Sequence, residues 1–272
     1  MMVRRFFLKV LGLGAFATTA PQQPLAHSVN ERRIFYLEDY GLNGDALIGG
    51  EWNAKFTDNA PLWNAIIERA QPFDEYVCPP GYMGFKSKPL MFPDYCKLSG
   101  RGAFAGLVKC YTPEDPTEFF FEVGPQYVTL ERLILYQGAG QSLGRAFGRV
   151  ATGAGGGLYG LVARDITISS FGDAKWRDAV VLDGTKETKL YGARTLCIDH
   201  LFVGAAVEDM ALCLSGIEGG GNIDKFQAAA GKLVLSGVKG INRSNVLHIS
   251  GNCNAAITMN NTLASKIGRA HV

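Results

Sequence analysis

The chain has 272 residues, which is enough for one large domain or two small ones. Apolar residues make up 47% of it and charged residues 19%, and this balance excludes an intrinsically disordered chain. The net charge is +2 at pH 7, and three positive residues, Arg4, Arg5 and Lys9, lie within the first ten. The rest of the chain is close to neutral, so its charge gives no support for nucleic-acid binding.

The first segment, residues 1–26, has a basic start followed by a short apolar run. The run is too short for a membrane span, and its pattern is typical of an export signal. RRFFLK (4–9) resembles the twin-arginine export motif, although Val3 stands where that motif has serine or threonine. We therefore expect a periplasmic or extracellular protein without membrane contact in its mature form. The alternative is a basic helix that stays attached as an anchor.

Residues 27–102 are expected to begin with a strand and one short helix. The strand-like run IFYL (34–37) leads into the glycine-punctuated turn DYGLNGD (39–45). Asn59 is the candidate N-cap, and apolar residues at helical spacing continue to Ala70. Strand segments are then expected around a Pro-Pro-Gly turn and before a Gly-x-Gly sequence, in EYVCPPGYM (75–83) and PLMFPDYCKLSGRG (89–102).

This order resembles the N-terminal start of the pectate-lyase-like family of right-handed parallel β-helices. That family opens with D-[FY]-G-A-x-G-D-G, then T-D-[DN]-T, an alanine-rich helix and a PPG-Y turn. The departures here are Leu42, Pro61, Trp63 and an insertion, ALIGGEWNAK (46–55). The matching residues are Asp39, Tyr40, Gly41, Gly44, Asp45, Thr57, Asp58, Asn59, Ala65, Ile66, Pro79, Pro80, Gly81 and Tyr82.

The resemblance implies an all-β chain, a right-handed parallel β-helix (solenoid) with a short N-terminal capping helix. A capping helix would cover the apolar end that such a solenoid otherwise exposes. A β-sandwich is the alternative fold.

Residues 103–265 are expected to form the body of this β-helix. ARDITISSFG (163–172) aligns with ARTLCIDHLFVG (193–204), and both runs alternate apolar and polar residues. The predicted inward residues are Ile166 and Ile168 in the first run, and Leu196 and Ile198 in the second. Further strands are expected in YVTLERLILY (127–136), KLVLSGVKG (232–240), SNVLHISGNC (244–253) and AITM (256–259).

The last seven residues, KIGRAHV (266–272), match a translation of the common short-read sequencing adapter. We therefore expect these residues to be foreign to the protein. The β-helix body would then be truncated near Ser265, and residues that carry chemistry would be missing beyond it.

The resemblance also implies a polysaccharide as the partner. A lyase acting on an acidic polysaccharide is expected, with an Arg or Lys base and, by family analogy only, Ca²⁺. A hydrolase with paired carboxylates is less favoured. Two further classes stay open: a phage or prophage tailspike depolymerase, usually a homotrimer, which degrades host capsule or O-antigen, and a non-catalytic carbohydrate-binding adhesin. The export signal argues against the tailspike.

Two segments supply the candidate catalytic residues. Ile198-Asp199-His200 resembles the W-I-D-H strand of one pectate lyase family, whose aspartate helps to bind calcium, with Cys197 in place of the tryptophan. The alternative is a polar turn between strands, where the internal alignment puts Asp199 and His200. The second segment, DAKWRD (173–178), is expected to form one loop at the groove wall, and it supplies Asp173, Arg177 and Asp178 as further catalytic candidates.

The same loop region supplies the candidate substrate-binding residues. Trp176 could stack on a sugar ring, and Lys175 lies beside it. Glu208 and Asp209 are adjacent acids in a later loop. The alternative for this region is a solvated loop whose tryptophan packs on its own coil.

The six cysteines contain no CxxC pair and no histidine at metal-ligand spacing. Most lie in apolar runs, which favours buried reduced thiols. A bridge between Cys78 and Cys96 is the alternative in an oxidising compartment.

Overall fold

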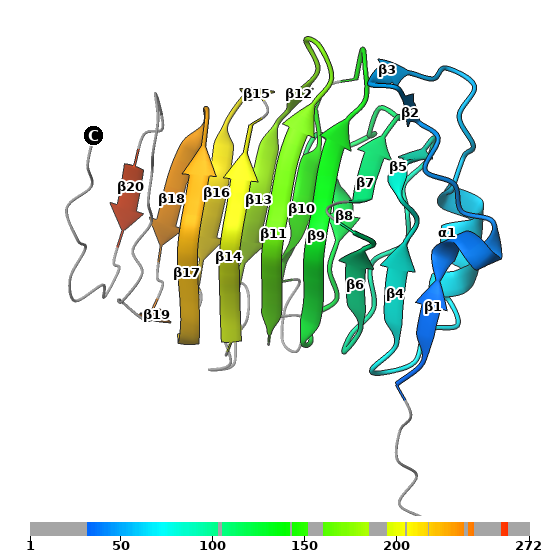
Figure 1. The fold of residues 1–272 in the computed structure, drawn as a ribbon. Coiled ribbons are helices and arrows are strands. Elements are labelled where there is room, and N and C mark those ends of the chain that lie inside the picture. The colour runs from blue at the N-terminus through cyan, green and yellow to red at the C-terminus, as the bar shows by residue number, and fades with distance from the viewer. Residues whose placement is uncertain are drawn as a thin grey trace, which may run out of the picture. The chain divides into compact units, whose positions relative to one another are not determined.

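The computed structural model describes residues 32–102, 105–141, 143–151, 160–184, 195–204, 206–216, 218–236, 239–241 and 257–260. All of them belong to one unit that begins at Arg32. They form mostly strands, which assemble into long parallel sheets (Figure 1). The expected all-β class is therefore confirmed, and the sheets are compatible with a solenoid. Among these residues no helix has the length and apolar character of a membrane span.

Two large sheets contain most of the strands. The ten-stranded sheet consists of β1 (Ile34–Tyr36), β4 (Glu75–Cys78), β5 (Gly81–Phe85), β6 (Lys97–Gly100), β7 (Ala105–Lys109), β9 (Val128–Gln137), β11 (Leu161–Ser170), β14 (Thr195–Val203), β17 (Glu218–Ala228) and β19 (Lys239–Ile241). The six-stranded sheet consists of β8 (Phe119–Glu122), β10 (Arg145–Val150), β13 (Asp178–Asp183), β16 (Met210–Ser215), β18 (Lys232–Ser236) and β20 (Ile257–Asn260).

Two small sheets lie beside them. β12 (Lys175–Trp176) pairs in parallel with β15 (Ala206–Val207). β2 (Leu47–Ile48) and β3 (Glu51–Trp52) form an antiparallel hairpin, and both strands come from the insertion between the two matched motif blocks.

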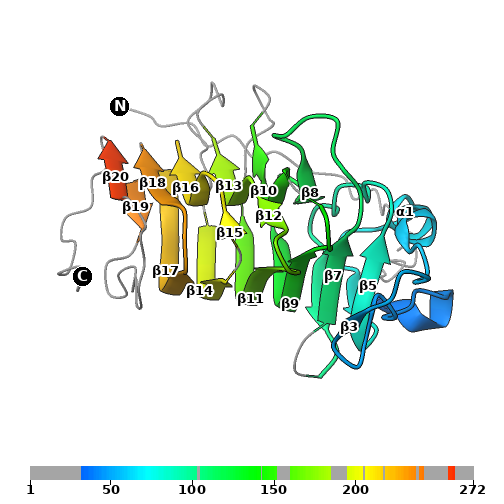
Figure 2. The ribbon, with the colours of Figure 1, turned by 90° about the horizontal axis from the view of Figure 1, so that it is seen from above.

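From β9 onward the chain alternates between the two large sheets. β9, β11, β14 and β17 belong to the ten-stranded sheet, while β10, β13, β16 and β18 follow them in the six-stranded sheet. Each pairs in parallel with the preceding strand of its own sheet. Figure 2 shows the two sheets as two facing rows. Their facing side chains therefore share one core.

Matching apolar side chains stack from strand to strand in this core. Ile166 on β11 pairs with Leu133 on β9 and with Leu201 on β14, and all three are at most 1% exposed. Burying one such side chain contributes roughly 1.5–3 kcal/mol. The predicted inward residues are confirmed as buried: Ile166, Ile168, Leu196 and Ile198.

The predicted register between β11 and β14 is wrong. The shared letters place Ala163 opposite Ala193, which lies outside the described residues, whereas the structure pairs Ala163 with Ile198. Both alignments put buried residues opposite buried residues, since Ile166 would face Leu196 in one and faces Leu201 in the other, so alternation alone does not fix the pairing. The observed pairing also brings the polar residues of the two strands together, with Arg164 opposite Asp199. The alternative interpretation of Asp199 and His200 as a turn between strands is also wrong, because both residues lie within β14.

Helix α1 (Ala60–Ile67) lies at the end of the sheets where the first strands are found (Figure 1). Its Trp63 is fully buried and meets the rings of Phe85, Phe92 and Phe121, with centroid distances of 5.9, 6.2 and 6.0 Å. The helix therefore packs on the first part of the core. It ends before the predicted position at Ala70.

Asn59 occupies the predicted N-cap position, but its side chain does not cap the helix. Asp58 Oδ1 accepts from the Ala60 N–H at 3.1 Å instead. The Asn59 carboxamide accepts from the Asn43 N–H at 2.8 Å and donates to the carbonyls of Asn43 and Gly84 at 3.0 and 3.1 Å. Asn59 therefore fastens the preceding turn to the start of α1.

The segment DYGLNGD joins this helix to the Pro-Pro-Gly turn. Its first residues belong to a 3-10 helix, η1 (Leu37–Tyr40), and not to an open turn. Asp45 accepts from the Thr57 N–H at 3.1 Å and from its hydroxyl at 2.9 Å. Gly44 must be glycine because a Cβ there would collide with the Pro80 carbonyl. The segment is thus a packed junction.

Five of the six cysteines are described, and all five are free thiols. Cys78, Cys96 and Cys213 are buried, which confirms the expectation for these three. Burial raises the pKa of the Cys96 thiol to about 11, so it is neutral at pH 7. The alternative bridge between Cys78 and Cys96 is not formed. Cys253 lies outside the described residues.

Candidate functional site

Three neighbouring strands each carry a pair of polar residues that interrupts their apolar alternation. The pairs are Glu131-Arg132 on β9, Arg164-Asp165 on β11 and Asp199-His200 on β14. The structure pairs Arg164 with Glu131 on one side and with Asp199 on the other. Buried apolar residues flank each pair, so the two polar side chains both project from the outer face of the ten-stranded sheet.

The second residue of each pair has a left-handed backbone. Arg132, Asp165 and His200 have φ values of 56°, 51° and 54°. This conformation is uncommon for residues other than glycine and costs about 1 kcal/mol or more. It recurs at the same place on three neighbouring strands, so it is a regular bend of the sheet. We call these three residues the polar column.

His200 lies between two carboxylates. Its Nδ1 atom is 2.7 Å from Oδ1 of Asp199 and 3.8 Å from Oδ1 of Asp165. Asp199 Oδ1 is shielded from solvent and has no hydrogen-bond partner of good geometry. The close contact with Nδ1 is therefore not aligned as a hydrogen bond. The imidazole itself is 47% exposed, so a substrate on the sheet could reach it.

An ion-pair network continues from this centre across the sheet. Arg164 lies 3.5 Å from Glu131, and Lys97 on β6 lies 2.8 Å from the other oxygen of Glu131. Partial burial alone would raise the pKa of the Glu131 carboxyl, but the hydrogen bond and charge of Lys97 lower it overall. Glu131 therefore stays charged at neutral pH and holds both cations in place.

Cations dominate the solvent side of this network. The side chains of Arg32, Lys97 and Arg164 are 52%, 24% and 51% exposed, whereas Glu75 and Glu131 are 14% and 17% exposed. Glu75 lies 2.7 Å from Arg32 and 3.3 Å from Lys97, beneath both. A molecule that lies across this ion-pair network therefore meets the cations before their carboxylate partners, whereas beside His200 it also meets the half-exposed Asp165.

Two residues of the DAKWRD segment face the interior, which corrects their predicted roles. Trp176 on β12 is fully buried; its ring stacks on Phe120 and its Nε1 donates to the Ser169 carbonyl at 2.8 Å. It cannot stack on a sugar from there. Asp178 on β13 is also fully buried, 3.0 Å from Arg145 Nε, and it accepts from the Met210 N–H at 3.1 Å. Its contacts are structural.

The segment is also not one loop, because β12 and the start of β13 lie within it. The candidates of this region that reach solvent are Asp173, Lys175, Arg177, Glu208 and Asp209.

Asp209 forms an ion pair with Lys232 at 2.9 Å, and the Asp209 N–H donates to the Arg177 carbonyl at 2.9 Å. These residues lie beside the six-stranded sheet, whereas Asp199 and His200 lie on the ten-stranded sheet. The structure therefore separates the two predicted groups of site residues.

Sequence reasoning missed Glu131, Arg164 and Asp165. The signal was present, since ER, RD and DH each interrupt an apolar–polar alternation at corresponding places in TLERLI, VARDIT and CIDHLF. Two adjacent outward residues in a strand indicate a bulge-like bend. The wrong register hid the correspondence between these pairs.

The residues of this centre do not suit calcium. Ca²⁺ takes six to eight oxygen ligands, whereas here an imidazole and a guanidinium lie beside the two carboxylates. Within the described ranges no group of three or more His, Cys, Asp and Glu side chains could hold a metal ion.

No protein-family model, curated protein or solved structure matches this chain.

Proposed function

We propose that this chain is an exported polysaccharide lyase that acts on an acidic polysaccharide. Its fold would be a right-handed parallel β-helix, with α1 as the N-terminal cap. The alternation of strands between two parallel sheets and the burial of Trp63 against the first core layers support this fold. Export rests on the RRFFLK motif.

One observation carries the proposed chemistry: an exposed imidazole lies beside two carboxylates, and the exposed guanidinium of Arg164 lies on the neighbouring strand. A histidine can gain or lose a proton near neutral pH. Nδ1 faces these carboxylates, so Nε2 is the nitrogen that would act as the base in this proposal.

The reaction would be a β-elimination. The imidazole of His200 takes the proton from the carbon next to the sugar carboxylate, and the released electron pair forms a carbon–carbon double bond. The glycosidic C–O bond on the adjacent carbon breaks. The leaving oxygen takes up a proton from the imidazolium or from water, so no water is consumed in the products.

The neighbouring residues have distinct roles in this proposal. Arg164 pairs with the sugar carboxylate and stabilises the negative charge that develops when the proton leaves. Asp199, whose Oδ1 lies 2.7 Å from Nδ1, is a positioning residue that sets the orientation of the imidazole. Asp165 adds negative charge near the same nitrogen, 3.8 Å away.

The test uses the full chain and a panel of acidic polysaccharides from bacterial capsules and plants. Ultraviolet absorbance follows the new double bond, and a reducing-end assay follows chain cleavage. We expect both signals to rise together on at least one polysaccharide. Reducing ends without the absorbance would indicate hydrolysis and contradict the lyase. Binding without either signal would indicate an adhesin.

A further inference from the structure

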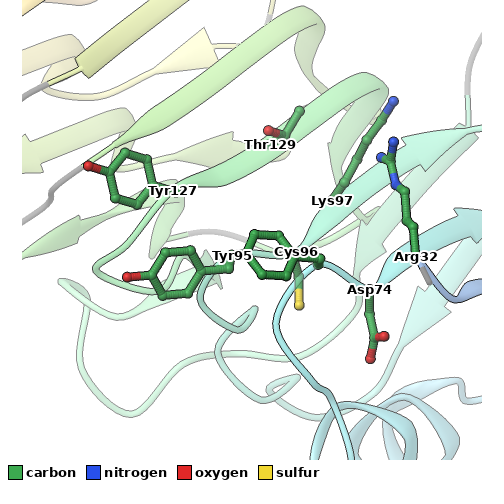
Figure 3. Close-up of a pocket in the computed structure, with 8 residues that line it drawn as sticks. Arg32, Asp74, Tyr95, Cys96, Lys97, Tyr127 and Thr129 are labelled. Atoms are coloured by element: carbon green, nitrogen blue, oxygen red, sulfur yellow. The ribbon is translucent and has the colours of Figure 1, made fainter. Parts of the chain in front are cut away.

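A pocket of about 300 Å³ opens where strands of the ten-stranded sheet begin. It lies before the starts of β4, β6 and β9, away from the polar column within β9, β11 and β14. Its walls differ in chemistry, with aromatic rings on one side and cations on the other (Figure 3). The lining residues are Arg32, Phe73, Asp74, Tyr95, Cys96, Lys97, Tyr127 and Thr129.

The aromatic wall is a row of three neighbouring rings, of which Tyr95 and Tyr127 are stacked and Phe73 is tilted against Tyr95. The Phe73 N–H donates to the Tyr95 carbonyl at 3.0 Å, which places these residues side by side on adjacent turns of the chain. The Phe73 and Tyr95 ring centroids are 5.9 Å apart, and those of Tyr95 and Tyr127 are 5.5 Å apart. We call these three residues the aromatic column. It ends at Gly160, where a Cβ would lie 2.8 Å from the Tyr127 ring.

All three aromatic residues have left-handed backbones, with φ values of 74°, 59° and 49° for Phe73, Tyr95 and Tyr127. Glycine would adopt this conformation without strain, so the bend does not require an aromatic side chain. Phe73 is 51% exposed and Tyr127 is 50% exposed. About half of the surface of each of these two residues therefore remains accessible to a ligand.

The cationic wall consists of Arg32 and Lys97, whose side chains lie near each other in Figure 3. Their shared partner Glu75 is 14% exposed and does not line the pocket. Asp74 does line it, but its side chain points away in Figure 3 and binds Arg33 through two hydrogen bonds of 2.8 and 2.6 Å. The charge that faces the pocket is therefore positive.

We propose that this pocket binds a carboxylate-bearing sugar unit of an acidic polysaccharide. Aromatic side chains suit the apolar C–H faces of sugars, and a guanidinium beside an ammonium suits a carboxylate. The Thr129 hydroxyl is a further polar group for the sugar hydroxyls. The exposed cations Lys97 and Arg164 continue from the pocket toward His200, so the polymer would lie across the strands. This inference rests on the proposed function for its substrate class.

The test measures binding of polygalacturonate, alginate and hyaluronan oligosaccharides and of their methyl esters, by calorimetry on the full chain. We expect at least one acid to bind, and its ester to bind about tenfold or more weakly because the charge is lost. Lys97→Met should weaken binding of the acid by a similar factor and remove the preference for the acid over the ester. Binding of no acid, or equal binding of acid and ester, would overturn the inference.

Tyr127→Gly tests the aromatic column without disturbing the bend. Its folded state keeps the left-handed backbone, so the unfolding midpoint should stay close to that of the wild type. Affinity should fall about tenfold. The matched control is Tyr40→Ala, an exposed aromatic residue outside the pocket, which should keep wild-type affinity. Equal affinity of wild type and Tyr127→Gly would overturn the inference.

The two proposals fail in different ways. If the protein cleaves a polysaccharide and Lys97→Met and Tyr127→Gly bind it as well as the wild type, the proposed sugar-binding role of the pocket is wrong and the proposed lyase activity stands. If binding depends on both residues but no cleavage occurs, the proposed lyase activity is wrong and the proposed sugar-binding role of the pocket stands.

Discussion

The residues of the aromatic column and of the polar column share a left-handed backbone conformation, but their side chains differ in chemistry. Both are sets of left-handed residues: the polar column lies within β9, β11 and β14, whereas the aromatic column lies just before the starts of β4, β6 and β9. In the aromatic column, the rings of Tyr95 and Tyr127 stack with an interplanar angle of 25°. In the polar column, His200 lies within 4 Å of an aspartate from its own strand and another from the next.

The comparison separates what the backbone needs from what the side chains supply. Glycine would form both bends with less strain, and the chain uses glycine for left-handed bends elsewhere, as at Gly41 and Gly81. The aromatic and charged residues at the two columns are therefore not explained by the bend. Their chemistry is explained if one column holds a sugar and the other transfers a proton.

The largest expected effect is on turnover in His200→Gly. Removing a general base lowers kcat by about a thousandfold, while the left-handed backbone keeps the fold. Arg132→Gly is the matched control, because it changes the same bend on β9 without removing a proposed reactive group. Steady-state cleavage rates check both variants. Equal losses in the two would show that the bend matters and the imidazole does not.

The second effect contrasts the outer and inner faces of β9. Leu133 is 1% exposed, and Leu133→Ala should lower the free energy of unfolding by roughly 3 kcal/mol through the cavity it leaves. Its neighbour Arg132 is exposed, and Arg132→Gly should change the free energy of unfolding by about 1 kcal/mol or less. Chemical denaturation measures both. A larger loss in Arg132→Gly would mean that the polar column supports the fold.

The third effect concerns the carboxylate behind the aromatic column. Asp74 is 2% exposed and accepts hydrogen bonds from Arg33, the Gln71 N–H and the Tyr76 hydroxyl. Asp74→Asn should cost roughly 2–3 kcal/mol, because these donors lose a charged acceptor. The exposed Asp115→Asn is the control, with a much smaller expected effect.

The Asp74 effect should depend on pH. Burial alone would raise the pKa of this carboxyl, but the hydrogen bonds from Arg33 and Gln71 lower it overall from 3.8. The stabilisation is therefore complete above pH 3.8 and is lost as the pH falls through the lower folded-state pKa. Unfolding curves of wild type and Asp74→Asn should converge in acid. A constant difference down to low pH would contradict this assignment.

The smallest effect contrasts the cations on the outer face with the buried Lys109. Desolvation lowers the pKa of Lys109 to about 8 from 10.5, so the folded state disfavours its charge. This cost is full below pH 8 and disappears as the pH rises toward 10.5.

Lys109→Met should therefore stabilise the protein at pH 7 by roughly 2 kcal/mol, after allowing for the lost 2.6 Å hydrogen bond to the Tyr111 carbonyl. The advantage should shrink as the pH rises above 8. A variant that is less stable than the wild type at pH 7 would contradict the desolvation argument. Thermal unfolding of both proteins at several pH values makes the comparison.

The sequence predicts the strands better than the contacts between them. Alternation identifies Ile166 and Leu196 as inward residues, because a strand has only two faces. It does not fix which strand positions meet, so the register between β11 and β14 is misplaced and the polar column is not recognised. The register between two strands depends on how all the strands of the sheet bury their side chains together, and the sequence of one strand does not contain that information.

The DAKWRD segment shows the same limit for the site. Polar neighbours make Trp176 and Asp178 look like surface residues, yet alternation within the short strands turns both inward. The partner of Asp178 is Arg145, 33 residues earlier in the chain, which no local pattern reveals. The sequence indicates Asp199 and His200 only through a short resemblance, and the structure adds Asp165 and Arg164 to them.

The most direct test of the division between the two columns is steady-state kinetics of Tyr127→Gly and His200→Gly on the same acidic polysaccharide. We predict that Tyr127→Gly raises KM and leaves kcat near the wild-type value, because it removes binding that substrate and transition state share. His200→Gly should lower kcat and leave KM nearly unchanged. Both variants losing the same kinetic parameter would contradict the division of binding and proton transfer between the two columns.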